Sequence, residues 1–307
     1  MDQEVFGLVA DVGGTNTRLG RVGTGGVVTE TVVKMPNDAY PSFTAMAKKY
    51  LVDQRPPKQV VVAVAGPVAG QKARLTNRNW DFDTREMAQE LGAKDVHLVN
   101  DLEALGAAVP TVSAAAIEPL HKGAMTRAEG QALVVGLGTG FNVAAVDMVS
   151  GAVFSAEQGH ASLPNNVVRL LETRLPDVSA FQTVENLFSG VGMLRLAGVL
   201  GLNANSAEEI ATSSNPKAQE AVEICTEAFA LMLRELAYMY FPRAGIFFNG
   251  SLAQLFLSPE RRGRVLAPLR SDDQFDGQFS RIPAFLFTSD TVALGGCAAR
   301  LLGRGQV

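Results

Sequence analysis

Short valine-rich runs separated by paired glycines open the chain. Residues 5–11, 16–22 and 27–34 have strand-like composition, and the pairs Gly13-Gly14 and Gly25-Gly26 lie between them. Valine favours strands, and adjacent glycines favour tight turns. The pattern therefore predicts a three-stranded antiparallel meander at the start of the chain.

Helical and strand-like periods alternate through the next part of the chain. Helical spacing occurs at residues 42–51, 84–91 and 102–109, and short apolar runs typical of buried strands occur at 59–65 and 96–99. A capping-box pattern of Thr84 and Met87 is expected to open the helix at 84–91. With the opening meander, the predicted order is β-β-β-α-β-α-β-α. This order is typical of a mixed sheet covered by helices.

The opening pattern recurs after a link that contains Pro and Ala at residues 110–116. Strands are expected at 132–136 and 142–147, on either side of a glycine-rich turn, and a third strand begins near Ala152. The recurrence predicts a second lobe that repeats the first sheet.

Helical periods dominate residues 164–240, which include a long segment rich in Ala, Leu and Met at 217–240. Strands are expected at 245–248 and 284–288, and a closing helix at 291–302. The second lobe is therefore expected to carry most of the helices.

Composition favours a globular protein that acts on small molecules. The chain has 307 residues, 47% of them hydrophobic, so it can bury the cores of two linked lobes. Its formal net charge of −4 argues against a surface that binds nucleic acid. Apolar runs fall far short of the roughly 20 residues that cross a bilayer, and the start of the chain lacks the features of a signal peptide. We therefore expect a cytoplasmic protein without a nucleic-acid or membrane partner.

The two cysteines, Cys225 and Cys297, lie far apart in the sequence, each within an apolar segment. Two such residues cannot build a disulfide framework or a cysteine zinc cluster. We expect both to be buried in the core.

The first candidate for chemistry is the turn Asp11-Val12-Gly13-Gly14-Thr15-Asn16. Adjacent glycines let the backbone approach a polyanion and present N–H groups to it, and Asp11 at the strand end could hold Mg²⁺ through water. An ordinary hairpin would also use two glycines. The motif alone leaves both interpretations open.

A second glycine turn, Gly138-Thr139-Gly140, occupies the same place in the second sheet. It is not a Walker loop, because no Gly-Lys-Ser/Thr follows, and a strand rather than a helix comes next. Two such turns in duplicated sheets can close on a triphosphate from both sides. A third small-residue turn, around Gly250, could let an adenosine lie against the backbone, although a plain strand-to-helix connection has the same composition.

Polar side chains suited to a sugar occur at two further places. Asn100-Asp101 follows a strand and precedes an apolar helix, where a carboxylate could accept a proton from a sugar hydroxyl or where both residues could serve as helix caps. Glu157, His160 and Glu185 could grip vicinal hydroxyls through strong hydrogen bonds, although a lone histidine is more often structural.

Taken in this order, these stretches resemble the bacterial glucokinase family of the actin, hexokinase and heat-shock ATPase superfamily. The resemblance covers most of the chain and also includes Ala65-Gly66-Pro67, Leu75-Thr76-Asn77, Trp80 and Ser189-Gly190. It implies a two-lobed, actin-like (ribonuclease H-like) α/β fold in which each lobe has a mixed β-sheet with flanking helices and a cleft separates the lobes. The implied domains are a small α/β domain of residues 1–109 and 289–307 and a large α+β domain of residues 110–288.

The resemblance also implies the activity, which is transfer of the γ-phosphoryl group of MgATP to the 6-hydroxyl of glucose. Asp101 would be the catalytic base, and Asp11 would position Mg²⁺. The sugar would contact Asn100, Asp101, Glu157, His160 and Glu185. The nucleotide would contact Asp11, Gly13, Gly14, Thr15, Asn16, Gly138, Thr139, Gly140 and Gly250. A homodimer is implied by the resemblance alone.

Several residues depart from the family pattern. Ala156 and Gln158 stand where glycines are usual, and Phe141-Asn142 replaces a smaller pair after the second phosphate turn. Asn249 and Ser251 flank Gly250 where small residues are expected.

The alternatives are another hexose or amino-sugar kinase of the superfamily, a catalytically inactive sugar-sensing regulator, and an actin-like filament or chaperone ATPase. The kinase group that includes repressors typically has a cysteine-rich zinc loop after its Gly-His. Here Ala161-Ser162-Leu163-Pro164 follows His160, which favours glucokinase.

Overall fold

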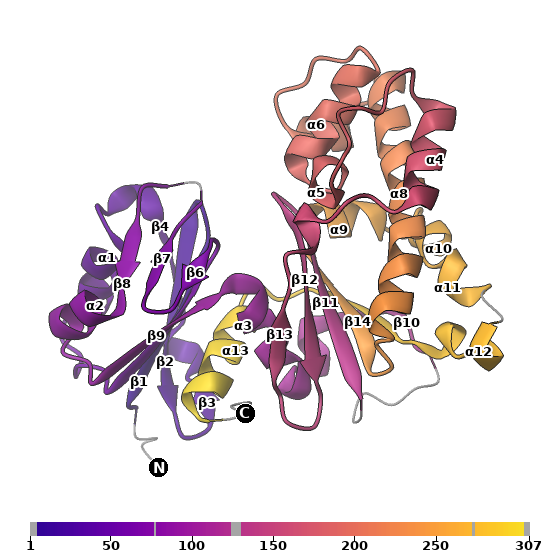
Figure 1. The fold of residues 1–307 in the computed structure, drawn as a ribbon. Helices are drawn as coiled ribbons and strands as arrows, with labels where there is room; N and C mark the ends of the chain where they lie inside the picture. Colours follow the sequence, from indigo (N-terminus) through magenta and orange to yellow (C-terminus); the bar gives the residue numbers. More distant parts are fainter. Residues whose placement is uncertain (1–4, 77, 124–129, 272–273, 304–307) are drawn as a thin grey trace. The chain divides into compact units, whose positions relative to one another are not determined.

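The computed structural model describes residues 5–76, 78–123, 130–271 and 274–303. Contacts group the chain into two compact units (Figure 1). The first unit contains the residues up to Ala116, residues 150–153 and the residues from Ser289 on. The second contains Ile117–Val149 and Phe154–Thr288.

The first unit is built on a mixed sheet in which β2 and β1 are antiparallel, and β1, β5 and β9 are parallel. The strand order is β3-β2-β1-β5-β9, and β4 also pairs with β2. The strands are β1 (Gly7–Val12), β2 (Asn16–Gly23), β3 (Gly26–Val27), β4 (Val33–Pro36), β5 (Gln59–Val64) and β9 (Asp95–Asn100).

The third strand of the predicted meander is broken in the middle. β3 and β4 both pair with β2, but the 3₁₀ turn Thr29–Thr31 separates them. The Thr31 hydroxyl accepts from the Arg21 N–H and donates to the Val28 carbonyl oxygen. A threonine that bonds backbone groups in this way competes with a regular ladder, which explains the interruption.

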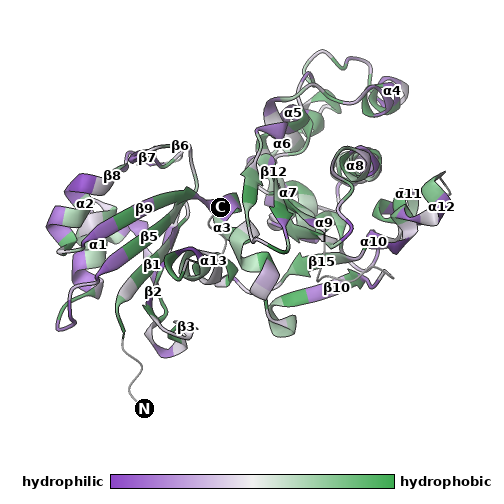
Figure 2. Ribbon diagram, turned by 60° about the horizontal axis from the view of Figure 1, so that its bottom comes forward, coloured by the Kyte–Doolittle hydropathy of each residue, from purple (hydrophilic) through white to green (hydrophobic). Residues whose placement is uncertain are grey.

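Helices cover both faces of this sheet. On one face, Leu8, Val62 and Leu98 pack with Phe43 of α1 (Phe43–Tyr50) and Met87 of α2 (Thr84–Leu91). Figure 2 shows the apolar character of the strands that these residues occupy.

α3 (Asp101–Ala108) and α13 (Val292–Leu301) lie together and contact the central strands. They approach so closely that a Cβ atom at Gly296 would lie 1.7 Å from the Ala104 carbonyl oxygen. The last helix of the described chain is therefore an integral part of the first unit.

Two details of this unit differ from the sequence prediction. α2 begins after Asp83, whose side chain accepts from the Arg85 N–H, so Asp83 and not Thr84 is the N-cap. A small antiparallel sheet was not predicted; it consists of β6 (Val68–Ala69), β7 (Lys72–Arg74) and β8 (Asp81–Asp83).

The second unit repeats the sheet pattern of the first, as the sequence predicts. β12 and β11 are antiparallel, and β11, β14 and β15 are parallel. The complete order is β10-β15-β14-β11-β12-β13. The strands are β10 (Ile117–His121), β11 (Gln131–Leu137), β12 (Phe141–Asp147), β13 (Val153–Ser155), β14 (Gly245–Asn249) and β15 (Ala284–Phe287).

The predicted helical region is confirmed, with several breaks. Its longest helix, α8 (Pro216–Tyr240), begins after the N-cap Asn215 and ends before Phe241, which adopts a left-handed conformation. Among the described residues, no helix is both long and apolar enough to span a bilayer. The other helices are α4 (Asn165–Arg174), α5 (Val184–Leu187), α6 (Gly190–Val199), α7 (Ala207–Thr212), α9 (Ser251–Phe256), α10 (Arg262–Val265), α11 (Ala267–Arg270) and α12 (Gln274–Gly277).

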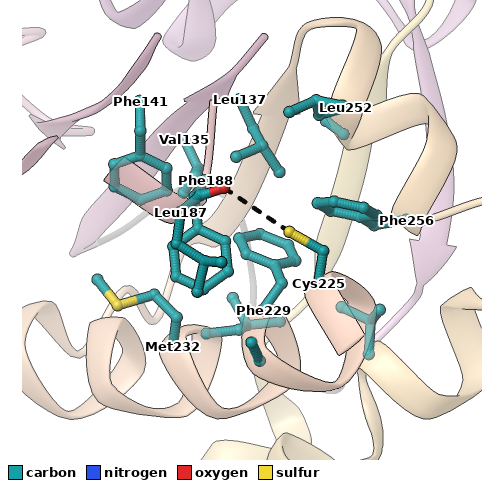
Figure 3. Packing of buried hydrophobic residues seen from close by; sticks show 14 of the residues in the cluster. Val135, Leu137, Phe141, Leu187, Phe188, Cys225, Phe229, Met232, Leu252 and Phe256 are labelled. Atoms are coloured by element: carbon teal, nitrogen blue, oxygen red, sulfur yellow. Dashed lines mark hydrogen bonds between the residues drawn. The ribbon is translucent and has the colours of Figure 1, made fainter. Parts of the chain in front are cut away.

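The core of the second unit lies between its sheet and α8. Phe229 of α8 packs against the rings of Phe188 and Phe256 with centroid distances of 5.8 Å (Figure 3). Cys225 lies in the same cluster, with its Sγ atom 3.7 Å from the Leu187 carbonyl oxygen. Both Cys225 and Cys297 are buried and free, as predicted.

Candidate active site

The first glycine turn joins β1 to β2 and is held in place by one asparagine. The Gly13 N–H donates to the Asn16 carbonyl oxygen over 3.1 Å. The amide of Asn37, in the 3₁₀ turn Asn37–Ala39, donates to the carbonyl oxygens of Gly13 and Gly14 over 2.8 and 3.2 Å. Because these carbonyl groups accept hydrogen bonds from the fully buried Asn37 side chain, the turn has a fixed shape before any ligand binds.

Sequence reasoning missed Asn37. It follows Pro36, where an asparagine reads as an ordinary turn residue. Its role becomes visible only through long-range contacts, which include a 2.8 Å hydrogen bond from the Thr17 hydroxyl to its Oδ1 atom.

Asp11 lies directly opposite Arg18 on the neighbouring strand β2. The Arg18 guanidinium is 3.6 Å from Asp11 and also donates to Asp290 over 2.9 Å. Burial raises the pKa of Asp11 to about 6, Arg18 opposes the shift, and the charges of Asp101 and Asp290 add to it. Asp11 and Asp101 therefore lie within electrostatic reach of each other. Arg18 and Asp290 are further neighbours of the predicted metal site.

Asn100 and Asp101 mark the junction of β9 and α3. Asn100 is the N-cap, because its Oδ1 atom accepts from the Leu102 N–H over 3.0 Å, while its Nδ2 donates to the Gly66 carbonyl oxygen over 3.2 Å. Asp101 also accepts from the Leu102 N–H, over 2.9 Å. The helix start thus uses part of the hydrogen-bonding capacity of both predicted site residues.

Asp101 nevertheless has the electrostatics of a candidate base. Burial raises the pKa of its carboxyl group, while hydrogen bonds from Leu102, from its own N–H and from the Asn100 side chain oppose the shift. A raised carboxyl pKa brings the group closer to the value that suits general base catalysis. The catalytic role itself stays a prediction.

The second glycine turn joins β11 to β12 and lies beside the turn that contains Gly250. β11 and β14 are parallel neighbours, so their carboxyl ends meet at one edge of the sheet. Gly250 has φ +107°, and a Cβ atom there would lie 2.3 Å from the Leu137 carbonyl oxygen. A Cβ atom at Gly138 would lie 3.7 Å from the Gly250 Cα. The structure thus brings two of the predicted nucleotide segments together.

Glu185 of α5 lies against the same turn. Its Oε2 atom accepts from the Phe141 N–H over 3.0 Å and is 2.6 Å from the place that a Cβ at Gly140 would occupy. The Gly190 N–H, at the start of α6, donates to the Gly138 carbonyl oxygen over 2.9 Å. Glu185, predicted as a sugar ligand, therefore also holds the second turn.

Glu157 and His160 lie at the ends of a short 3₁₀ segment, and both are exposed. Between them, Gly159 is buried, and a Cβ atom there would lie 2.3 Å from the Phe141 carbonyl oxygen and 3.3 Å from the Glu185 Cβ. Only glycine permits this approach. The structure thus brings the segment of Glu157 and His160 next to Glu185 and the start of β12.

The residues fit a magnesium site that is shared with a substrate. Among the residues that the structure describes, no three His, Cys, Asp or Glu side chains are grouped to hold a metal ion. Mg²⁺ is commonly bound by one or two carboxylates together with substrate phosphates, and it keeps several waters. Asp11, with Asp101 nearby, matches that arrangement rather than a cage made entirely of protein ligands.

The duplicated mixed sheets, each with a glycine turn between its antiparallel strands β1 and β2 or β11 and β12, define the actin-like ATPase fold of sugar kinases. A crystal structure of glucokinase from an Antarctic psychrotroph has this fold, with a TM-score of 0.80, 24% identity, and coverage of 97% of this chain and 98% of that one. A glucokinase from Balamuthia mandrillaris, solved in complex with glucose, has a TM-score of 0.73 and 19% identity over 98% of this chain and 94% of that one.

The family model named Glucokinase matches residues 8–303, so this chain belongs to the glucokinase family. A glucokinase from Nitrobacter hamburgensis is 28% identical, over 95% of each chain. The bifunctional protein glk of Burkholderia pseudomallei is 29% identical over 96% of this chain. This chain spans 48% of the length of that bifunctional relative.

Proposed function

We propose that this chain is an ATP-dependent glucokinase that converts glucose and MgATP to glucose 6-phosphate and MgADP. Membership of the glucokinase family supports the activity and the substrates. The structural observation that carries the proposal is the half-buried Asp101 carboxylate, which lies at the start of α3, directly after β9, within electrostatic reach of Asp11.

In the proposed reaction, the 6-hydroxyl oxygen of glucose attacks the γ-phosphorus of ATP. The bond between that phosphorus and the β,γ-bridging oxygen breaks, and ADP leaves. Asp101 accepts the proton that the hydroxyl loses as the new bond forms. Its raised pKa makes it a better proton acceptor than an ordinary aspartate.

The two glycine turns would hold the phosphates through backbone N–H groups. Their proposed nucleotide contacts are Gly13, Gly14, Thr15, Asn16, Gly138, Thr139 and Gly140, and Gly250 would face the adenosine. Asp11 would hold Mg²⁺ through water, and the ion would neutralise charge on the transferring phosphoryl group. Fixed turns of this kind lower the cost of ordering a triphosphate.

The sugar hydroxyls would be bound by Asn100, Glu157, His160 and Glu185. The exposure of Glu157 and His160 supports this assignment, because an exposed polar side chain can exchange water for a hydroxyl group at little cost. Glu185 would take a hydroxyl with the part of its carboxylate that does not bind Phe141.

We also propose that the enzyme has a small domain of residues 1–109 and 289–307 and a large domain of residues 110–288. The grouping of contacts into two compact units supports this division, although residues 110–116 and 150–153 group with the first unit. A cytoplasmic location, where ATP is available, and a homodimer complete the proposal.

A coupled assay of ADP release with glucose, mannose, fructose and N-acetylglucosamine tests the activity. We expect glucose to give the highest kcat/KM. A strong preference for another sugar would make the protein a different hexose kinase. Sugar binding without ATP turnover would indicate a regulator, and ATP hydrolysis that is insensitive to sugar would indicate an ATPase of another class.

A further inference from the structure

Asn142 is the second residue of β12 and follows the second glycine turn closely. It pairs with Gly136 of β11 and is half-buried. It belongs to the pair Phe141-Asn142, which departs from the pattern of the family that the sequence resembles.

The Asn142 side chain makes hydrogen bonds from both ends of its amide. Its Oδ1 atom accepts from the Gln158 N–H over 3.0 Å and from the Val143 N–H over 2.9 Å. Its Nδ2 donates to the Oε2 atom of Glu157 over 3.3 Å. One side chain therefore fixes both the backbone after Glu157 and the Glu157 carboxylate.

This combination requires an amide. Aspartate has the same shape and could accept from Gln158 and Val143, but it has no N–H to offer Glu157. A hydrogen bond to a carboxylate is stronger than one between neutral groups, so the Asn142 amide can hold the carboxylate in one orientation.

Glu157 needs such a partner because it is exposed. An unrestrained glutamate samples many rotamers, and binding of a ligand to it costs the conformational entropy of the side chain. A carboxylate that is already oriented loses less entropy on binding, and it also distinguishes hydroxyl groups by direction.

We propose that Asn142 is a positioning residue that orients the Glu157 carboxylate for the sugar and thereby sets sugar affinity and discrimination between epimers. This inference rests on the proposed function, since it assigns Glu157 to a sugar. Asn142 itself need not touch the sugar, and it takes no part in the phosphoryl transfer.

Two substitutions separate the hydrogen bonds of Asn142. Asn142→Asp keeps the acceptor for Gln158 but places a second carboxylate against Glu157, whereas Asn142→Ala removes all three bonds. We expect both variants to raise the glucose KM and the glucose Kd from calorimetry by about 10-fold or more, since a charged hydrogen bond is lost. We expect the ATP KM to stay unchanged and kcat to change far less than the glucose KM.

Asn166 provides a matched control on α4. Its amide donates to the Glu235 carboxylate over 2.8 Å, and its Oδ1 atom accepts from the N–H of the next residue, Val167, over 2.8 Å. Asn166→Asp therefore makes the same chemical change at a side chain whose partners, Glu235 and Val167, are not candidate site residues. We expect it to lower the melting temperature at least as much as Asn142→Asp while leaving the glucose KM and Kd at the wild-type values.

The outcomes are distinct. A normal glucose Kd in Asn142→Asp with a weakened one in Asn142→Ala would mean that Asn142 only anchors the backbone, and this would overturn the inference. The inference would also be overturned if Asn142→Asp raised the glucose Kd by the same factor in a Glu157→Ala protein as in the wild type, because the Glu157→Ala protein has no carboxylate for Asn142 to orient. If the wild-type protein binds glucose but does not turn over, the proposed activity fails, while the binding data still test Asn142. If it binds no sugar, both fail.

Discussion

The Asn37 amide donates to the Gly13 carbonyl oxygen over 2.8 Å, across 24 positions of the sequence. A buried side chain thus supports the turn that we assign to the nucleotide phosphates. Support of this kind determines whether a turn is ready for its ligand or must be ordered on binding.

Asn37→Ala should weaken ATP binding. The turn loses the donor to Gly13 and Gly14, and the Thr17 hydroxyl loses its acceptor inside the protein. We expect an unfolding free energy lower by about 2–3 kcal/mol, because buried groups are left without partners, and a raised ATP KM. Thr226→Val is the control. Thr226 is also fully buried, in α8, and its hydroxyl donates to the Val222 carbonyl oxygen, so the variant should be less stable than the wild type but keep a normal ATP KM. Equal ATP KM values in the two variants would reject a role for Asn37 at the turn.

Asp101→Asn should remove most of the turnover and keep glucose binding. A general base contributes about 10²- to 10⁴-fold to the rate, and it acts mainly in the transition state. Glu103→Gln is the control on the same helix, because it breaks the ion pair between Glu103 and Arg300 and leaves the proposed base in place. Steady-state kcat and calorimetric glucose Kd give the comparison. A kcat of Asp101→Asn within about tenfold of the Glu103→Gln value would exclude Asp101 as the base, since it would fall short of the range for a general base.

Asp11→Asn should stabilise the metal-free protein near neutral pH. The pKa of Asp11 is about 6 in the folded protein against 3.8 in the reference state, so folding favours the protonated form. The stability linked to this proton is fully present below pH 3.8 and is lost as the pH rises through about 6. The asparagine variant cannot lose this proton, so its unfolding free energy does not fall in this way. The excess of its unfolding free energy over that of the wild type should therefore grow between about pH 4 and 6, to at most about 3 kcal/mol.

Urea unfolding of both proteins across that pH range and up to neutral pH, with a chelator present, measures the difference. A gap that is independent of pH would show that Asp11 has an ordinary pKa. The same substitution should abolish turnover at every pH, because the residue that we assign to Mg²⁺ is lost.

Gly250→Ala should raise the ATP KM with little change in the glucose Kd. The methyl group would collide with the Leu137 carbonyl oxygen and displace the turn from Gly138. Gly70→Ala separates this effect from backbone strain, because Gly70 also has a positive φ, of +59°, but no atom lies within 4 Å of the position that an alanine methyl group would take there. We expect the Gly70 variant to lose about 1 kcal/mol of stability and to keep its ATP KM. A normal ATP KM in Gly250→Ala would remove this turn from the nucleotide site.

The spacing of apolar residues along the chain predicted those helices and strands whose formation depends mainly on nearby residues. The parallel strands, the long helix α8 and the duplicated glycine turns follow directly from runs of apolar residues and from paired glycines. The two wrong predictions, the unbroken third strand and the N-cap of α2, have one cause, which is a side chain that hydrogen-bonds nearby backbone groups. The Thr31 hydroxyl breaks the third strand, and Asp83 competes successfully with Thr84 for the start of α2.

The supporting residues of the candidate site could not be found in this way. Asn37, Arg18 and Asn142 each act through a partner that is between 15 and 272 positions away, and their neighbours in the sequence look ordinary. The departure of Asn142 from the family pattern was the one available signal. It indicated an altered site, but not which carboxylate the amide would hold.

The close approach of Gly296 to Ala104 makes the packing of α3, which is synthesised early, depend on α13, which is synthesised near the end. The helix that begins with the proposed base is packed by a segment that the ribosome makes only after the whole second unit. A nascent chain that ends before Ser289 therefore contains Asp101 but lacks the helix that packs beside it, so we expect such chains to engage chaperones until α13 emerges.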